Sequence, residues 1–410
     1  MKKDFCRFCN SSLNHVFVDL GNTPLANSFL DESELKKNEL TIPLIAYVCE
    51  NCFLVQLTES SSPKEIFSDY AYFSSYSSTW LKHAENYVQM MSEHYSFNEN
   101  SLVIELASND GYLLQYFKQK NIPVLGIEPA ENVAKFAIKK GIDTKIDFFT
   151  EDFATDLKNN NKQADLIVAN NVLAHVPELN NFVTGIRILL KDNGIATLEF
   201  PHLLNLIEKN QFDTIYHEHF SYFSLITVID LFKHHKLEVF DVEEISTHGG
   251  SLRLFVKHHG NTNFSKTPKI KNILDKELDA GLNKIDTYKN FSMAAEKIKK
   301  DLNFFLQNCK KSGKQVIGYG APAKGNTLLN FCNIDKTLIS YTVDKNIHKQ
   351  GKYLPGIQIP IKSLEEIKKT KPDFVLILPW NLQNEIINEI NFIQDWGGKF
   401  VIPIPEVKIL

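Results

Sequence analysis

The chain has 410 residues, of which 43% are hydrophobic and 23% charged, a composition typical of a globular protein with room for two or three domains. Its net charge of -4 offers no basic surface for nucleic acid, so no nucleic acid polymer is expected as a partner. The sequence has no apolar run long enough to cross a membrane and no signal-peptide pattern at its N-terminus, so we expect a cytoplasmic protein without a membrane partner.

Two Cys-x-x-Cys pairs open the chain, Cys6 with Cys9 and Cys49 with Cys52. Two residues between cysteines place both thiolates on one turn, and two such pairs can close a tetrahedral four-sulfur zinc site. A closed site leaves no position for water, so this zinc is expected to be structural. The alternative is that the cysteines are redox-active or unliganded. The insert between the pairs, residues 10–48, is expected to fold as a substantial loop.

A stretch rich in tyrosine and serine follows at residues 67–76, and a helix is predicted at residues 79–95. Clustered tyrosines offer rigid contact area with a polar tip, as in a lid over a binding site. The same composition also suits a plain connector, and the pattern favours neither reading.

From residue 101 onward, apolar runs alternate with helix-periodic segments, which predicts an α/β fold with a parallel sheet covered on both faces. A later helix at 225–235 precedes strands at 237–244 and 251–257, close enough in sequence to pair as an antiparallel edge. The other predicted strands span residues 101–108, 124–129, 165–170 and 194–200, with helices at 112–119 and 130–140.

Polar residues follow the carboxyl ends of these strands, where an open α/β sheet binds its ligand. The first loop lacks the glycines of the dinucleotide fingerprint, which disfavours NAD. Glu105 instead suits a cationic cofactor, and Glu128 can accept hydrogen bonds from ribose hydroxyls. Together with the antiparallel edge, these groups favour S-adenosylmethionine, although the two glutamates could merely cap helices. The expected cofactor-binding residues are Glu105, Ser108, Asn109, Asp110, Gly111, Glu128, Pro129, Asn170 and Asn171.

The segment Tyr216–Ser224 places two histidines around a glutamate, with tyrosines nearby. Histidine can remove a proton near neutral pH, glutamate can orient it, and tyrosine can donate to an oxyanion, so acid–base chemistry is predicted here. A metal site and a plain surface loop are the alternatives. The turn at residues 247–253 is either a substrate contact or only a hairpin.

Residues 260–312 are charged and helix-periodic, which predicts a helical connector. A second, smaller α/β domain follows at residues 313–410, with a glycine turn and Lys324 at the start of a helix. A helix N-terminus beside a lysine can bind an anion such as a nucleotide diphosphate, or the glycines can serve only a tight turn. The predicted strands of this domain are 314–320, 338–344, 373–378 and 399–404.

In this order, the motifs resemble those of three-domain sugar C-methyltransferases that act on nucleotide-linked 4-keto-deoxysugars. The resemblance covers nearly the whole chain. It rests on the four cysteines and on the segments Glu105–Gly111, Asn170–Pro177, Tyr216–Phe220, His248–Arg253 and Gly318–Thr327. It implies a zinc-binding module (1–65), a lid or helical connector (66–100), a central class I methyltransferase domain (101–259), a helical connector (260–312) and a C-terminal Rossmann-like substrate-binding domain (313–410).

The resemblance also implies roles for particular residues. His219 would be the base that removes a proton beside the ketone, with Tyr216 and Glu218 supporting the base and the sugar, and Tyr72 or Tyr70 reaching the substrate. The resulting enolate would take a methyl group from S-adenosylmethionine, with C3 as the expected carbon, in deoxysugar, surface polysaccharide or natural-product biosynthesis. The implied substrate-binding residues are His175, His248, Arg253, Tyr319, Lys324, Asn326 and Thr327.

Two other functions compete with this prediction. A sugar O- or N-methyltransferase would need a base but no ketone, and it would not exchange a carbon-bound proton with solvent. A non-catalytic, zinc-containing binding protein would not bind S-adenosylmethionine. A dehydrogenase fits less well, because the glycine fingerprint is missing.

Overall fold

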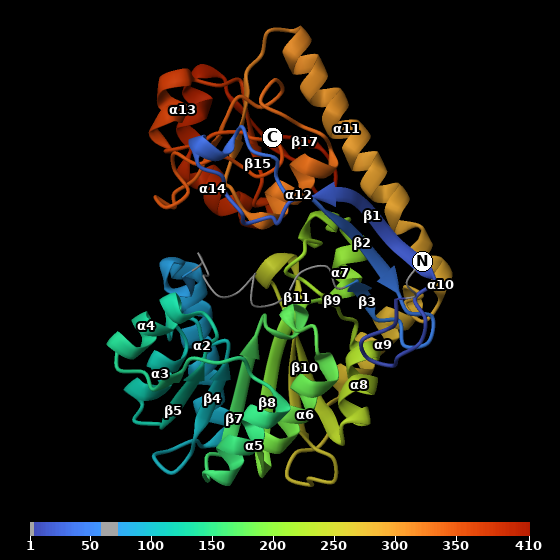
Figure 1. The fold of residues 1–410 in the computed structure, drawn as a ribbon, viewed down its shortest axis with the longest axis vertical. Helices are drawn as coiled ribbons and strands as arrows, with labels where there is room; N and C mark the ends of the chain where they lie inside the picture. Colours follow the sequence, from blue (N-terminus) through green and yellow to red (C-terminus); the bar gives the residue numbers. More distant parts are fainter. Residues whose placement is uncertain (1–3, 59–72) are drawn as a thin grey trace.

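The computed structural model describes residues 4–58 and 73–410. The strands of these residues form sheets of four, seven and six strands. The seven-stranded and six-stranded sheets belong to two α/β bodies stacked along the long axis, and the four-stranded sheet lies beside their junction (Figure 1). The predicted α/β class is confirmed.

The four-stranded sheet is antiparallel and draws its strands from two distant parts of the chain. Its order is β1 (His15–Thr23), β2 (Ile42–Val48), β3 (Val55–Leu57) and β9 (Ser221–Tyr222). The insert between the cysteine pairs was expected to be a loop, and that expectation was wrong. It forms β1 and β2, with the short 3₁₀ turn η1 (Glu32–Glu34) between them.

The seven-stranded sheet has the order β10-β11-β8-β7-β4-β5-β6. From β8 to β6 neighbouring strands run parallel, whereas β10, β11 and β8 pair antiparallel. The antiparallel edge predicted from the sequence is therefore confirmed. The strands are β4 (Val103–Leu106), β5 (Val124–Ile127), β6 (Thr144–Lys145), β7 (Ala164–Asn170), β8 (Leu190–Pro201), β10 (Leu237–Ile245) and β11 (Ser251–His258).

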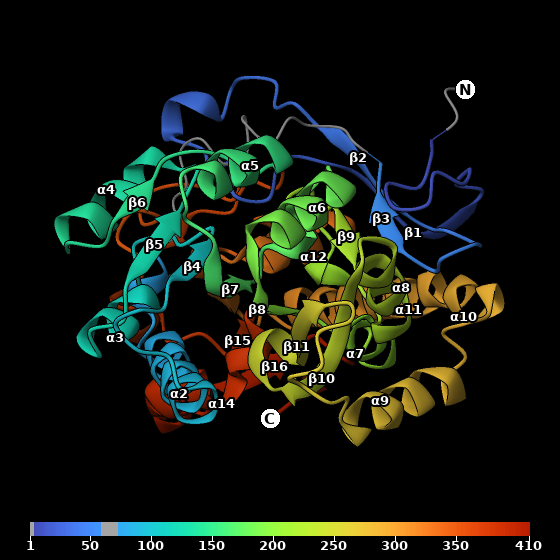
Figure 2. The ribbon, with the colours of Figure 1, turned by 90° about the horizontal axis from the view of Figure 1, so that it is seen from below.

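Helices cover both faces of this sheet: α5 and α6 lie on one side, α2 and α3 on the other (Figure 2). Serine and threonine cap several of them; the Ser224 hydroxyl, for example, accepts from the backbone N–H of Thr227 at 3.2 Å at the start of α8. The helices are α2 (Ser78–Tyr95), α3 (Leu114–Gln119), α4 (Glu131–Lys139), α5 (Glu151–Asn159), α6 (Leu179–Leu189), α7 (Leu203–Glu208) and α8 (Leu225–His234). Short 3₁₀ turns that matter for the site are η2 (Ser74–Tyr76), η3 (Leu173–His175), η4 (Phe212–Thr214) and η5 (Thr247–Gly249).

A helical connector leads to the six-stranded sheet, whose order is β14-β13-β12-β15-β16-β17. The connector consists of α9 (Pro268–Asp279), α10 (Ile285–Lys289) and α11 (Phe291–Lys311). The strands are β12 (Val316–Tyr319), β13 (Thr342–Val343), β14 (Ile361–Lys362), β15 (Phe374–Ile377), β16 (Lys399–Ile402) and β17 (Lys408–Ile409). The helices are α12 (Ala323–Phe331), α13 (Glu365–Thr370) and α14 (Gln383–Glu389), with 3₁₀ turns η6 (Trp380–Leu382) and η7 (Asn391–Trp396).

The strand predicted at residues 338–344 is shorter than expected. Only Thr342 and Val343 form β13, because only these two residues pair with β12 and β14. The apolar residues before them, Leu338 and Ile339, pack into the core without joining the sheet. An apolar run can therefore be buried although some of its residues lie outside the strand.

Residues of the zinc module belong to two different hydrophobic cores, one shared with the C-terminal domain and one shared with the central domain. Residues of β1, β2 and β3 share one cluster with α11 and the C-terminal sheet, and Phe17 stacks on Phe291 with ring centroids 4.4 Å apart. Cys6, Cys49 and Cys52 instead belong to the core of the central domain. The module therefore joins the two larger bodies.

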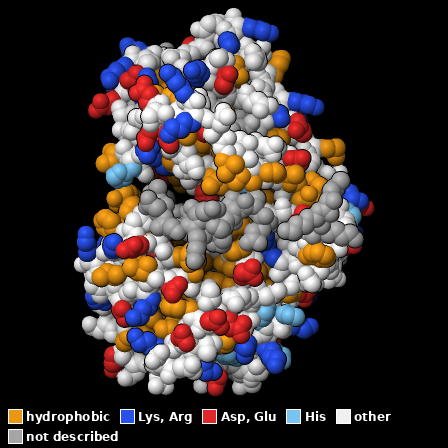
Figure 3. All heavy atoms as spheres, in the orientation of Figure 1, with side chains coloured by type: hydrophobic (Ala, Val, Ile, Leu, Met, Phe, Trp, Pro, Cys, Tyr) orange, Lys and Arg blue, Asp and Glu red, His pale blue; other side chains and the backbone are white. Residues whose placement is uncertain are grey.

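On the face seen in Figure 3, positive and negative side chains are interspersed over both bodies, in keeping with the small net charge. In the described part of the chain, no helix has the length and apolar character needed to span a bilayer.

Candidate active site

The four predicted zinc ligands come together in the structure. Their sulfur atoms all lie within 4.8 Å of one another, with Cys6 Sγ 3.5 Å from Cys52 Sγ and Cys9 Sγ 3.5 Å from Cys49 Sγ. Four sulfurs bound tetrahedrally at about 2.3 Å from a zinc ion are about 3.8 Å apart, so the cysteines fit one ion. Among residues 4–58 and 73–410 no other group of three or more potential ligands converges, and a metal site at the two histidines of Tyr216–Ser224 is not supported there.

The zinc-binding turn is tied to the loops that carry two predicted active-site histidines. Arg7 lies between the first two cysteines, and its Nη1 donates to the carbonyl oxygen of Pro177 at 3.0 Å. Its guanidinium also lies 5.4 Å from the ring centroid of Phe220. Pro177 closely follows His175 and Phe220 directly follows His219, so the metal turn supports both loops.

The carboxyl end of β4 presents buried polar atoms with no hydrogen-bond partner among the described residues. They are Glu105 Oε2, Ser108 Oγ and Asp110 Oδ1, and the side-chain amide of Asn171 after β7 is in the same condition. Burial raises the pKa of Glu105 well above its usual value. Since buried polar atoms are normally paired, this edge fits a polar, cationic ligand such as S-adenosylmethionine.

Glu128 hydrogen-bonds to two backbone N–H groups at the same edge. Its Oε2 accepts from the backbone N–H of Asn109 and its Oε1 from that of Ala130, both at 2.8 Å. Burial raises the pKa of Glu128 to about 7. The capping role considered for this residue is therefore real, yet each carboxylate oxygen can accept a second hydrogen bond. Pro129 lies half-buried beside it, and Asn170 is buried at the end of β7.

Gly111 lies in the predicted loop for a packing reason. Its φ is +76°, and a Cβ atom there would come within 3.0 Å of Ile142 Cγ1 and 3.3 Å of Ala137 Cβ. A side chain would thus collide with the neighbouring helix and strain the backbone. The glycine permits the turn at the end of β4 that presents Ser108 and Asp110.

The described end of the tyrosine- and serine-rich stretch contacts this loop. The backbone N–H of Ser74 donates to Asn109 Oδ1 at 2.9 Å, and the Ser75 hydroxyl donates to the carboxylate of Asp110. These contacts join the described end of the stretch to the loop after β4. Tyr70 and Tyr72 lie outside the described residues.

The geometry around His219 fixes which ring nitrogen carries a proton. Its Nδ1 lies 2.9 Å from the carbonyl oxygen of Thr214, which can only accept, so Nδ1 is the donor. In the neutral ring Nε2 is then the acceptor, and it receives the hydroxyl of Tyr216 at 2.9 Å. Burial, and next the neighbouring His175, lower the pKa of His219 well below its usual value. His219 is therefore a neutral imidazole with its lone pair on Nε2.

His175 and Glu218 lie next to His219. The rings of His175 and His219 meet edge to face with centroids 4.6 Å apart, and His175 Nδ1 donates to the carbonyl oxygen of Glu218 at 2.7 Å. Glu218 Oε1 accepts from Asn27 Nδ2 at 2.6 Å, which brings the zinc module to the site. Burial raises the pKa of Glu218 to about 7. The segment is thus buried, and a plain surface loop is ruled out as a description.

The turn at residues 247–253 is both a hairpin and part of this cluster. It joins β10 to β11, with positive φ angles at His248, Gly249 and Gly250. The His248 ring lies 5.3 Å from that of Trp80 in α2. The His248 side chain is exposed, while desolvation by the surrounding protein, and next the charge of Lys324, lower its pKa.

Arg253 has partners within the chain. Its Nη2 lies 2.6 Å from Glu199 Oε1 and its Nη1 2.9 Å from Glu243 Oε2, and its guanidinium lies 4.9 Å from the ring centroid of Tyr87. The structure therefore assigns it a buried ion pair, a role that the sequence prediction as a substrate ligand did not include. Arg253 and His83 also line a pocket of about 350 Å³.

The predicted residues of the C-terminal domain separate into two groups. Lys324 joins the cluster: its charge depresses the pKa of both His219 and His248, after burial and other causes. Tyr319 instead donates its hydroxyl to Glu389 at 2.8 Å. Asn326 Oδ1 accepts from Asn330 Nδ2 at 3.1 Å in the same helix, and Thr327 is buried beside it.

Sequence reasoning missed several residues of the site. Asp213, Trp380 and Asn27 lie in segments with no recognisable motif, and each meets the site only through the tertiary fold. Glu199 was predicted as part of a strand, but its partners His83 and Arg253 come from distant elements. The only local signal was the position of Glu199 inside an otherwise apolar strand. A buried carboxylate is energetically costly unless it has a partner.

Three family models match consecutive parts of the chain. A zinc binding domain matches residues 6–67, a methyltransferase domain matches residues 83–242, and a C-methyltransferase C-terminal domain matches residues 246–405. The chain is also 35% identical, over 408 residues, to C-methyltransferase NovU of Streptomyces niveus, covering 99% of this chain and 97% of that protein.

Solved methyltransferase structures align with less than half of the chain. An S-adenosylmethionine-dependent methyltransferase from Clostridium acetobutylicum is 12% identical and covers 44% of this chain and 92% of its own, with a TM-score of 0.34. One from Anabaena variabilis is 17% identical and covers 43% and 85%, with a TM-score of 0.35. The family is established by the full-length relative and the domain matches: the chain belongs to the S-adenosylmethionine-dependent C-methyltransferases with an N-terminal zinc-binding domain.

Proposed function

We propose that this C-methyltransferase acts on a nucleotide-diphosphate-linked 4-keto-deoxysugar and methylates C3, the carbon beside the ketone. The observation that carries the proposal is the hydrogen-bonded series Thr214–His219–Tyr216. An O- or N-methyltransferase needs no proton removed from carbon. A half-buried, neutral histidine with an oriented lone pair and a phenol at its basic nitrogen suits that harder step.

The series can exchange its hydrogen bonds as the reaction proceeds. In the free protein the Tyr216 hydroxyl donates to Nε2 of His219. Nε2 has a single lone pair, so the Tyr216 hydroxyl must turn away from it before that nitrogen can take the proton from C3. Tyr216 would turn its proton toward the ketone oxygen, where the negative charge of the enolate develops as Nε2 removes the C3 proton. Base and oxyanion donor would thus act together.

S-adenosylmethionine supplies an electrophilic methyl group when it is bound. Glu105, Ser108, Asp110 and Asn171 are the residues whose unpartnered buried atoms would hold it. Asn109, Gly111, Glu128, Pro129 and Asn170 would shape this edge around them. A dry enclosure formed with η2 would keep water from competing for the methyl group.

The substrate would lie between the central domain, the zinc module and the C-terminal domain. Glu218, held by Asn27, would bind a sugar hydroxyl, and Lys324 would face the diphosphate at the start of α12. His175 and His248 would complete the sugar site, and Tyr70 or Tyr72 would reach the substrate. For Tyr319, Asn326 and Thr327 we propose support of the turn before α12.

The test separates proton removal from methyl transfer. A panel of nucleotide-diphosphate 4-keto-6-deoxyhexoses is incubated in D₂O with wild type and His219→Ala, and deuterium at C3 is followed by NMR. Wild type should exchange the C3 proton and, with S-adenosylmethionine, form a C-methyl product. His219→Ala should lose most of both activities, about 10²–10⁴-fold, yet still bind S-adenosylmethionine in calorimetry.

His259→Ala is the matched control, because His259 is exposed and lies after β11. It should exchange and methylate like wild type. Wild-type turnover in His219→Ala would refute the assignment of the base. A methylated product with no exchange of any carbon-bound proton would instead indicate an O- or N-methyltransferase.

A further inference from the structure

Each of the three consecutive residues of the 3₁₀ turn η4 (Phe212–Thr214) contacts a different part of the molecule. Phe212 and Asp213 face the C-terminal domain, whereas the carbonyl oxygen of Thr214 accepts from Nδ1 of His219 at 2.9 Å. All three residues are buried, with exposed fractions of 0%, 0% and 7%. The turn thus lies between a domain surface and the base.

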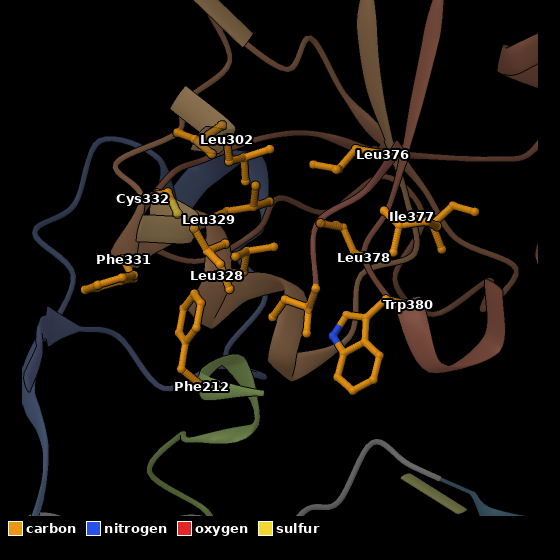
Figure 4. Close-up of a cluster of buried hydrophobic side chains, with 14 of the residues drawn as sticks. Phe212, Leu302, Leu328, Leu329, Phe331, Cys332, Leu376, Ile377, Leu378 and Trp380 are labelled. Atoms are coloured by element: carbon orange, nitrogen blue, oxygen red, sulfur yellow. The ribbon is translucent and has the colours of Figure 1, made fainter. Parts of the chain in front are cut away.

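Phe212 docks into the C-terminal domain. Figure 4 shows its ring pointing from the central domain toward α12, beside Leu328 and Phe331. The rings of Phe212 and Phe331 meet edge to face with centroids 5.1 Å apart, and Phe212 belongs to the hydrophobic core of that domain. Burying this ring removes a large apolar surface from water, so the contact holds the turn against α12.

Asp213 receives a hydrogen bond from the other side of the same interface. Nε1 of Trp380 donates to Asp213 Oδ2 at 2.7 Å, and Lys324 Nζ lies 4.6 Å from the Trp380 ring centroid. The second oxygen, Oδ1, has no hydrogen-bond partner among the described residues. The indole N–H of Trp380 therefore orients this buried carboxylate from another domain.

The same indole also approaches the turn that carries His248. A Cβ atom on Gly249 would lie 2.8 Å from Trp380 Cη2, so only glycine permits this approach. The carbonyl oxygen of Gly249 in turn accepts from Gln211 Nε2 at 3.0 Å, next to η4 in sequence. Trp380 thus contacts both loops that bring histidines to the site.

We propose that Asp213 and Trp380 are positioning residues through which docking of the C-terminal domain sets the orientation of His219. The inference rests on the proposed function, in which His219 is the base. The carbonyl of Thr214 holds the proton on Nδ1 and thereby keeps Nε2 as the acceptor. Because this carbonyl belongs to the docked turn, a C-terminal domain held elsewhere would leave the ring free to rotate or to exchange its proton between nitrogens.

The test uses Trp380→Phe in the full-length protein, because it removes the N–H while keeping an aromatic ring. Backbone hydrogen–deuterium exchange of residues 212–219 should accelerate about tenfold or more. C3 deuterium exchange with the 4-keto sugar panel should slow about tenfold in its rate constant at saturation, with a smaller change in KM. Affinity for S-adenosylmethionine should stay within twofold, since the cofactor edge lies on other loops.

Trp396→Phe is the matched control. Trp396 lies in the same domain, and its Nε1 donates to the carbonyl oxygen of Pro372 at 3.0 Å, away from η4. This variant should leave both exchange rates within twofold of wild type. Equal losses in the two variants would mean that a tryptophan N–H merely stabilises the domain, and would overturn the proposal.

A pair of substitutions at Asp213 gives an independent test. Asp213→Asn keeps an oxygen that can accept from Trp380, whereas Asp213→Ala keeps none, so the asparagine variant should retain several times more C3 exchange. Wild-type exchange rates in Trp380→Phe, for both backbone and sugar, would overturn the inference. If wild type itself exchanges no sugar proton, the proposed function fails instead, and the backbone exchange of residues 212–219 still decides the docking contact.

Discussion

Glu199 and Glu105 are both buried glutamates near the carboxyl ends of strands in the central sheet. They differ in the partners of their carboxylates, and this difference distinguishes a scaffold residue from a candidate ligand-binding residue. Glu199 in β8 accepts from His83 Nε2 at 2.9 Å and pairs with Arg253 at 2.6 Å. Glu105 in β4 has a carboxylate oxygen with no partner among the described residues. A paired buried carboxylate is part of the scaffold, whereas one with an open oxygen is arranged for a ligand.

The pKa values of the two carboxyl groups move in opposite directions. Burial raises the pKa of Glu105 well above its usual value. Burial acts in the same sense on Glu199, but the hydrogen bond from His83 and the charge of Arg253 outweigh it and lower the pKa of that carboxyl. The same desolvation therefore gives opposite outcomes, and the presence of a partner decides which.

The largest expected effect is on stability and comes from the paired glutamate. Glu199→Ala leaves Arg253 buried beside the half-buried Glu243 alone, so the free energy of unfolding should fall by about 3–5 kcal/mol in urea denaturation. Glu243→Gln, which removes the outer partner, should cost under about 1 kcal/mol. Similar losses in the two variants would show that Glu199 is not the main partner.

A double substitution sharpens the same point. Glu199→Gln with Arg253→Met removes both charges, so the combined loss of stability should be smaller than the sum of the two single losses. Additive losses would mean that the 2.6 Å contact contributes nothing specific to the folded protein.

The next effect concerns binding and should appear only at the unpaired glutamate. Glu105→Gln keeps the shape but removes the charge, and affinity for S-adenosylmethionine should fall about 10–100-fold, as expected for a hydrogen bond to a charged group. Thermal stability without the cofactor should not fall. Glu131→Gln, on the exposed face of α4, is the control and should bind the cofactor like wild type.

The smallest effect is a pH dependence. A carboxyl with a raised folded-state pKa stabilises the fold below its unfolded value, near 4.3, and loses that contribution as pH rises through the folded value. The melting temperature of Glu105→Gln minus that of wild type, both without cofactor, should therefore increase from pH 5 to pH 8. This difference cancels the other titrating groups, and a constant difference would show that Glu105 is not desolvated.

Local patterns predicted the parts of the site that lie within one element. The apolar run of β4 predicted both the strand and the place of Glu105 at its end, and the cysteine spacing predicted the cluster of four sulfurs. The same patterns suggested a substrate contact at Arg253, because its buried partner Glu199 lies far away in sequence. Lys324 was singled out from its place at a helix N-terminus, whereas its contact with the Trp380 ring, 4.6 Å from Nζ to the centroid, had no signal in the sequence.

Residues that meet only through domain packing could not be found in this way. Nothing around Asp213 or Trp380 distinguishes them from ordinary turn residues, and their contact depends on how two domains dock. The predicted domain boundaries stay a prediction, and the four-stranded sheet shows why a linear division of this chain is difficult. Its fourth strand comes from residues far beyond the cysteines.

That strand has a practical consequence for engineering. Because β9 (Ser221–Tyr222) pairs with β3 just after His219, the N-terminal module and the segment bearing His219 form one exchangeable unit. A chimera that takes only the N-terminal module from a relative would mismatch the sheet edge close to His219. Recombination intended to alter substrate choice should therefore transfer residues 212–224 together with the cysteine module.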